Sequence, residues 1–167
     1  MYVSIRLIYS TNLFERLQVV STFAILETGF CTKNGGTKML EIGLKGYQEV
    51  MVTEENSAKT MGSGTLDVFA TPAMIALMEE TAWKSVQPYL EEGQGSVGIQ
   101  LNVDHVAATP LGMKVHCESE VTAVEGRKLT FKIEAYDEAG LIGKGTHERF
   151  VVENEKFQGK ANRKLEK

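Results

Sequence analysis

The sequence contains few of the residues that mark metal-binding and redox proteins. Its 167 residues include two cysteines, Cys31 and Cys117, and three histidines. Neither cysteine lies in a C-x-x-C pair or in a cluster with histidine, so the spacing predicts neither a zinc site nor a redox centre. We therefore expect no metal and no cofactor, and a reducing, cytoplasmic environment is the default for such a chain.

Basic charge and long apolar runs are also lacking. The formal net charge is -4 and the isoelectric point is near 5.5, whereas a protein that neutralises phosphates needs a clustered basic face. The candidate apolar segment at residues 17–26 is too short to cross a bilayer, and Glu27 follows it where a signal peptide would need a small residue. Nucleic acid and membranes are therefore not expected partners.

The chain divides into three parts. Residues 1–38 show no sustained periodicity and end in the loop-like run TKNGGT, and the regular pattern begins at Met39. We hypothesise that Met39 is the natural start and that residues 1–38 are an upstream extension, with a genuine but variable N-terminal arm as an equal alternative. Residues 39–153 are expected to form one domain, and residues 154–167 a charged, mobile tail.

The pattern predicts one strand, one helix and then four strands. Thr71 is the expected helix cap, since Pro72 suits the first turn and Pro88 disfavours helical geometry just before it. The helix, residues 72–86, is apolar on nearly all sides over its first three turns, so it should be buried. Strands are predicted at residues 43–53, 96–108, 113–124, 128–136 and 141–152, the last three as antiparallel hairpins. An antiparallel sheet of about five strands wrapped around one long central helix is an α+β arrangement, the hotdog fold.

Two adjacent carboxylates, Glu79 and Glu80, interrupt the apolar helix. Glu80 has Lys84 four residues later, the favourable order for a helical ion pair, so we interpret it as a partly exposed structural residue. Glu79 lies among apolar residues and has no cation within helical reach. Because a buried carboxylate is costly, its presence favours a catalytic base or nucleophile. The alternative is a structural carboxylate bonded to backbone amides at a dimer interface.

Alternation along the strand at residues 96–108 places His105 on the apolar face, toward the helix. The inward residues would be Val97, Ile99, Leu101, Val103 and His105, and the outward ones Ser96, Gly98, Gln100, Asn102 and Asp104. An inward histidine is usually a hydrogen-bonded core residue, but beside an inward glutamate and a threonine it could complete an acid–base constellation. Gly98 has no side chain to pack, which indicates a bulge or the close approach of another group, with an exposed edge bulge as the alternative.

The last strand carries His147 and Arg149 in the run GTHER. A carboxylate or phosphate would suit the Arg149 guanidinium, which binds such groups in bidentate fashion, while an ion pair with Glu148 or Glu134 is the structural alternative. His116 falls on the polar face of its strand, and we interpret it as a solvated surface residue.

Five features stand in order along the chain. They are VFAT at residues 68–71, Glu79 eight residues later, VDHVAATP at 103–110, VEGR at 124–127 and GTHER at 145–149. Together, with their matching spacing, they resemble the fluoroacetyl-CoA-thioesterase-like branch of the hotdog thioesterases. The likeness begins near residue 43 and continues past the last strand into the tail segment EKFQGKANRK.

This resemblance implies an acyl-CoA thioesterase with a catalytic threonine, glutamate and histidine, which fall on Thr71, Glu79 and His105. It also implies a glycine near the thioester carbonyl, matching Gly98, and an arginine near the far end of the substrate site, matching Arg149. The fluoroacetyl-specific members carry phenylalanines in a lid before the VFAT run, whereas residues 60–66 (TMGSGTL) contain none. This departure weakens the case for fluoroacetyl-CoA as the substrate and leaves hydrolysis of a small acyl-CoA as the expected activity.

Two other functions stay open at this point. A hotdog protein could bind acyl-CoA without hydrolysing it, as a sensor or carrier. An enoyl-CoA hydratase would need an Asp/His pair, but alternation sends Asp104 and His105 to opposite faces. Because a lone five-stranded sheet leaves an unpaired edge and a half-covered helix, we also expect a homodimer with the sheets joined edge to edge and the CoA groove near the seam.

Overall fold

The computed structural model of the protein describes residues 39–166, so the predictions for residues 1–38 and Cys31 lie outside the described residues. Five strands follow one another as β1 (Lys45–Met51), β2 (Gln94–His105), β3 (Lys114–Glu125), β4 (Lys128–Asp137) and β5 (Gly140–Glu153). The α-helices are α1 (Thr71–Val86) and α2 (Asn154–Asn162), and short 3-10 helices are η1 (Glu54–Asn56), η2 (Gln87–Tyr89) and η3 (Arg163–Glu166).

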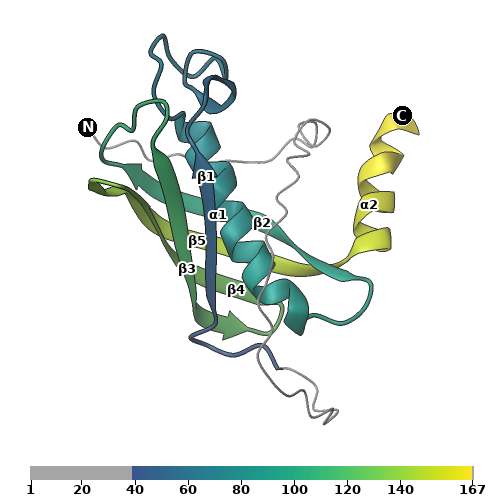
Figure 1. The fold of residues 1–167 in the computed structure, drawn as a ribbon. Coiled ribbons are helices and arrows are strands. Elements are labelled where there is room, and N and C mark those ends of the chain that lie inside the picture. Colours follow the sequence, from purple (N-terminus) through teal and green to yellow (C-terminus); the bar gives the residue numbers. More distant parts are fainter. Residues whose placement is uncertain (1–38, 167) are drawn as a thin grey trace, which may run out of the picture.

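The five strands form one antiparallel sheet that curves around α1 (Figure 1). The order across the sheet is β1-β3-β4-β5-β2, so β1 and β2 lie at its two edges. β3, β4 and β5 form the predicted hairpins, whereas β2 pairs with β5 rather than with β3, which follows it in the chain. The predicted architecture, an antiparallel sheet around one long helix, is therefore present.

Helix α1 supplies the centre of the hydrophobic core. Its buried side chains cover most of its circumference: Met74, Ile75, Leu77, Met78, Thr81, Ala82 and Val86. They pack against inward residues of the strands, such as Val115, Phe131 and Ile133. Full burial of one such large apolar side chain contributes about 1.5–3 kcal/mol. The apolar side chains from which the sequence predicts a buried helix thus also hold the sheet against α1.

The start of α1 differs from the prediction. The capping residue is Ala70, and Thr71 and Pro72 are the first residues of the helix. No side chain caps the first turn; the Thr71 hydroxyl instead hydrogen-bonds to Nδ1 of His105, with 2.9 Å between the two atoms. The prediction that Thr71 caps the helix was therefore wrong, because a tertiary partner on β2 takes up its hydroxyl.

A β-bulge in β2 changes which side chains face the helix. The register shifts between Gly98 and Gln100, so Ile99 has no partner on β5 and is 47% exposed. Beyond the bulge the predicted facing holds, and Leu101 and Val103 are buried. Before it, the predicted facing was wrong: Ser96 and Gly98 point inward, opposite the buried residues Val151 and Arg149 of β5. One extra residue inverts the alternation.

Two predictions about surface residues had different outcomes. Glu80 pairs with Lys84 across one helical turn, with 2.5 Å between carboxylate oxygen and ammonium nitrogen, as predicted. His116 is not freely solvated. Its half-buried ring stacks between Tyr47 and Tyr136 on neighbouring strands, with ring centroids 5.4 and 5.3 Å away. The ladder of aromatic rings on the outer face of the sheet explains its burial.

The charged tail forms α2 and η3, which the sequence pattern did not predict. None of the side chains of α2 is buried, and Figure 1 shows this helix projecting from the end of β5, away from the sheet. No helix among residues 39–166 is long and apolar enough to cross a membrane.

The close approach of β2 and β5 leads to a stability prediction. A Cβ atom on Gly145 would overlap the backbone of Asn102 and Val103, whereas one on Gly159 in α2 would meet nothing within 4 Å. We expect Gly145→Ala to lower the free energy of unfolding by about 2 kcal/mol or more, because backbone atoms cannot move aside cheaply. Gly159→Ala is the matched control and should leave stability equal or slightly higher. Urea unfolding at one protein concentration measures both; equal stability of the two variants would contradict the packing described.

Candidate active site

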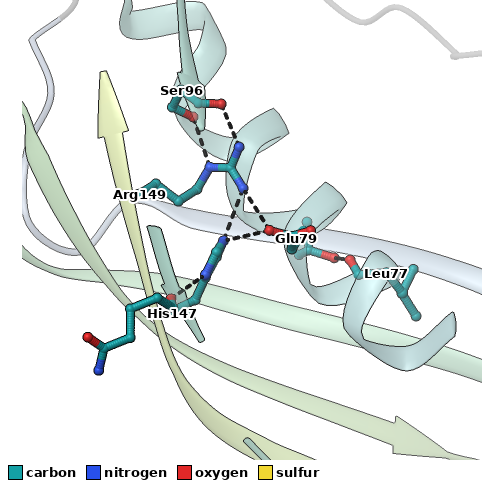
Figure 2. A network of polar contacts seen from close by, with 7 residues as sticks. Leu77, Glu79, Ser96, His147 and Arg149 are labelled. Carbon is teal, nitrogen blue, oxygen red and sulfur yellow. Dashed lines mark hydrogen bonds and ion pairs between the residues drawn. The ribbon is translucent and has the colours of Figure 1, made fainter. Parts of the chain in front are cut away.

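Glu79 lies on α1 where the helix crosses β2 and β5. Its side chain is 20% exposed, and its Oε1 atom is 3.7 Å from both Nη1 of Arg149 and Nε2 of His147. Figure 2 shows Arg149 and His147 converging on this carboxylate from β5. The cation that α1 itself does not supply to Glu79 is therefore Arg149 of β5, about 70 positions later in the chain.

The hydrogen bonds of His147 fix its tautomer. Its Nδ1 is 3.0 Å from the Gln100 carbonyl oxygen, and its Nε2 is 3.0 Å from Nη1 of Arg149. A guanidinium can only donate, so Nε2 accepts, and the proton on Nδ1 is donated to the carbonyl. Burial, reinforced by the positive charge of Arg149, lowers the pKa of His147 to about 4, so the ring is neutral at pH 7.

Arg149 is 5% exposed and is held from two sides. Its Nε donates to the Ser96 hydroxyl at 2.9 Å and its Nη2 donates to the Ser96 carbonyl at 2.6 Å. On the other side it faces His147 and Glu79. The structure thus provides the carboxylate partner that suits an arginine.

The alternative ion pairs predicted for Arg149 do not form. Glu148 pairs with Lys128 and Glu134 pairs with Lys132, each at 2.8 Å. Side chains alternate between the two faces of a strand, and Glu134 and Glu148 occupy outward positions of β4 and β5. Their side chains therefore lie on the outer side of the sheet, while Arg149 lies on the inner side.

Gly98 lies directly beside the Glu79 carboxylate. A Cβ atom at this position would overlap Oε1 of Glu79 and lie 3.1 Å from Cε1 of His147. Gly98 is also the residue at which the β2 bulge begins. Both features expected of this glycine, a bulge and the close approach of another group, are therefore present. A glycine here makes room for the carboxylate oxygen itself.

Thr71 and His105 form a second group at the start of α1. Nδ1 of His105 bonds to the Thr71 hydroxyl. Among residues 39–166, Nε2 of His105 is the buried side-chain nitrogen or oxygen that has no hydrogen-bond partner. Burial lowers the pKa of His105, opposed in part by the backbone of Ala107, which favours the protonated ring. Its environment favours a neutral ring with one unused nitrogen.

The predicted residues therefore form two groups within one chain. One holds Thr71 and His105; the other holds Glu79, Gly98 and Arg149. Eight residues of helix separate Thr71 from Glu79, which is about 12 Å along the axis. Within one chain the rise of the helix therefore separates Thr71, which contacts His105, from Glu79.

Three further contacts were missed from the sequence. Ser96 and His147 both accept hydrogen bonds from Arg149, and the Gln100 carbonyl accepts one from His147. The alternation that placed Ser96 on the outer face ignored the bulge after Gly98, which leaves no periodic signal. His147 shares a strand face with Arg149, two residues away, and this spacing was the available signal.

Asp104 and His105 lie on opposite faces of β2, as predicted. Asp104 lines a hollow on the outer face of the sheet with Lys132 and Lys144, whereas His105 contacts α1. Asp104 and His105 therefore cannot act together as the pair that a hydratase would need. No group of His, Cys, Asp and Glu within the described residues is placed to hold a metal ion.

Comparison with known proteins agrees with this geometry. A family model described as fluoroacetyl-CoA-specific thioesterase matches residues 52–155. The fluoroacetyl-CoA thioesterase of Streptantibioticus cattleyicolor is 46% identical over 98 residues, which are 59% of this chain and 70% of that protein. A solved structure of a fluoroacetyl-CoA thioesterase covers 75% of this chain and 97% of its own, with a TM-score of 0.72 and 36% identity. A thioesterase superfamily member from Thermus thermophilus covers 75% and 93%, with a TM-score of 0.69 and 31% identity.

The sheet around α1 and the glutamate that α1 carries beside Gly98 define a hotdog-fold thioesterase, a thioester hydrolase. Within that class, the chain belongs to the family of fluoroacetyl-CoA-specific thioesterases.

The lowered pKa of His147 predicts a pH dependence of stability. Its pKa is about 4 in the folded protein against an ordinary value of 6.5, so between these values the unfolded chain binds more protons. The stabilisation is complete above pH 6.5 and is lost as pH falls toward 4, by up to about 3 kcal/mol.

Unfolding by urea at several pH values between 4 and 7 measures this loss. His147→Gln, which cannot titrate, should show a smaller fall over the same range, because His105, whose pKa is also lowered, still contributes. Identical pH slopes for wild type and His147→Gln would contradict the neutral, buried ring.

Proposed function

We propose that this chain hydrolyses a small acyl-CoA thioester to the free acid and CoA, with Glu79 as base or nucleophile. The observation that carries the proposal is the placement of the Glu79 carboxylate against the backbone of Gly98, where its oxygen takes the space that a Cβ atom would fill. The related protein from Streptantibioticus cattleyicolor is a fluoroacetyl-CoA thioesterase. Residues 60–66 of this chain carry no phenylalanine, so we do not extend that substrate preference to it. An acyl-CoA substrate favours a cytoplasmic location.

Thioester hydrolysis needs an attacking oxygen, a site for negative charge on the carbonyl oxygen, and help for the departing thiolate. Glu79 attacks the carbonyl carbon directly to give a mixed anhydride and the CoA thiolate, and water then hydrolyses the anhydride. Alternatively, Glu79 removes a proton from an attacking water, or from Thr71, whose acyl ester water then hydrolyses. The amide of Gly98 is our candidate donor for the carbonyl oxygen, and Arg149 our candidate substrate-binding cation, placed beside Glu79 rather than at the far end of the site. His105 assists by holding Thr71 or by donating to the thiolate.

Replacement of Glu79 tests its role. Glu79→Gln keeps the shape of the side chain but removes the charge and the basicity, so thiol release should fall by at least ~10²-fold. Glu80→Gln is the matched control, because the adjacent carboxylate pairs with Lys84 at the surface. A thiol-release panel over short, branched and aryl acyl-CoAs provides the measurement. Near-normal activity of Glu79→Gln would remove this carboxylate from the mechanism.

We further propose that the enzyme is a homodimer whose active site joins the two groups described above. β2 is an edge strand with an exposed Ile99, and Val106 just beyond it is exposed as well. Antiparallel pairing of β2 with its copy, about an axis near Leu101 and Asn102, would bring His105 of one chain beside Gly98 of the other. This arrangement would also give Nε2 of His105 a partner, either Glu79 of the second chain or the substrate.

Mixed dimers test this arrangement. Glu79→Gln and His105→Ala should each be inactive alone, but chains mixed by co-expression or joint refolding would form heterodimers with one intact site. Random pairing then restores about a quarter of the wild-type activity. No restoration would show that Glu79 and His105 do not act across subunits.

A matched control carries both substitutions on one chain. Mixed one to one with wild type, this double variant inactivates every heterodimer, so about a quarter of the activity remains. If Glu79 and His105 acted within one chain, half would remain.

A further inference from the structure

The Arg149 guanidinium is fixed by partners on β2, on its own strand β5 and on α1. Ser96 on β2 accepts from Nε and Nη2, with distances of 2.9 and 2.6 Å to its hydroxyl and carbonyl oxygens. These two bonds occupy one edge of the planar group. The other nitrogen, Nη1, is thereby turned toward His147 and Glu79 (Figure 2).

His147 limits the remaining freedom of Nη1. Its Nε2 accepts from Nη1 at 3.0 Å, while its Nδ1 is anchored on the Gln100 carbonyl at 3.0 Å. The ring is 1% exposed, so it has no solvent-filled space into which to rotate. Nη1 therefore lies between an uncharged acceptor at 3.0 Å and the carboxylate of Glu79 at 3.7 Å.

We propose that Ser96 and His147 are positioning residues of the thioesterase: they hold Arg149 so that its Nη1 faces Glu79, and so set the orientation of that carboxylate beside Gly98. This inference rests on the proposed function. Neither residue touches the reacting atoms. They act through Arg149, and an error of about 1 Å in the position of a reactive group can cost ~10²-fold in rate.

Protonation of His147 would break this arrangement. A proton on Nε2 would meet an N–H of Arg149, and the acceptor would be lost. The groups that face the ring are Glu79 from α1, Arg149 from β5, the Gln100 carbonyl from β2 and the Phe131 ring from β4, whose centroid is 6.2 Å away. Glu79 is the group among these that could offset the added positive charge, and it is also the reactive group.

Substitutions of His147 separate positioning from structure. His147→Leu removes the acceptor, and we expect kcat to fall about 10-fold or more with KM changed less than about 3-fold. His147→Gln offers an amide oxygen to Arg149, so it should recover much of the lost kcat. Because glutamine does not titrate, the acid limb of the kcat-against-pH profile of His147→Gln should also differ from that of wild type. Equal impairment of both variants, with an unchanged pH profile, would overturn the proposal.

Ser96→Ala provides a second test that does not alter the buried ring. It removes the hydroxyl that accepts from Nε and keeps the carbonyl that accepts from Nη2. We expect a smaller loss of kcat than in His147→Leu. Ser119→Ala is the matched control: Ser119 is a buried serine of β3 that contacts the Thr81 carbonyl, away from the Glu79 group. Equal kcat for Ser96→Ala, Ser119→Ala and wild type would contradict the role of Ser96.

A double variant distinguishes this inference from the proposed function. If His147 acts through Glu79, then Glu79→Gln combined with His147→Leu should be no slower than Glu79→Gln alone. If the two substitutions lowered the rate by factors that multiply, the positioning role of His147 would be overturned, but the proposed thioesterase activity would stand. Absence of thiol release by wild type with every acyl-CoA would instead refute the proposed function.

Discussion

The ion pair between Glu79 and Arg149 is the interaction on which the site depends. It joins the one long helix to the last strand, and both partners lie largely out of water. Loss of the Glu79 carboxylate would remove this compensating negative charge from the buried Arg149 guanidinium, which is unfavourable for folding. The pair thus links α1 to β5 at the same point at which α1 places the Glu79 carboxylate beside Gly98.

The bulge in β2 makes this arrangement possible. Without the extra residue at Ile99, Ser96 and Gly98 would point outward, as simple alternation predicted. With it, Ser96 reaches the Arg149 guanidinium and Gly98 faces the Glu79 carboxylate. A local irregularity of one residue therefore builds the environment of the glutamate, in keeping with the frequent occurrence of bulges beside active sites.

Much of the fold followed from local patterns. The buried helix, the hairpins and the surface pairing of Glu80 depend on composition, turn residues and spacing, which are readable along the chain. The inward orientation of Ser96, the true helix cap and the partner of Arg149 were not readable, because each depends on a contact between distant segments. The separation of Thr71 and His105 from Glu79 follows from helix geometry, since eight residues extend about 12 Å. Motif resemblance identified these residues as a set but carried no information on how they meet.

The most direct measurement is a crystal structure of the Glu79→Gln variant with an uncleaved acyl-CoA. The thioester carbonyl carbon should lie beside Gly98, about 3–3.5 Å from the side chain of residue 79 if that residue attacks directly, or one water molecule away from it if it acts as a base. A thioester bound well away from Gly98, with no path to residue 79, would contradict the role of Glu79 as base or nucleophile.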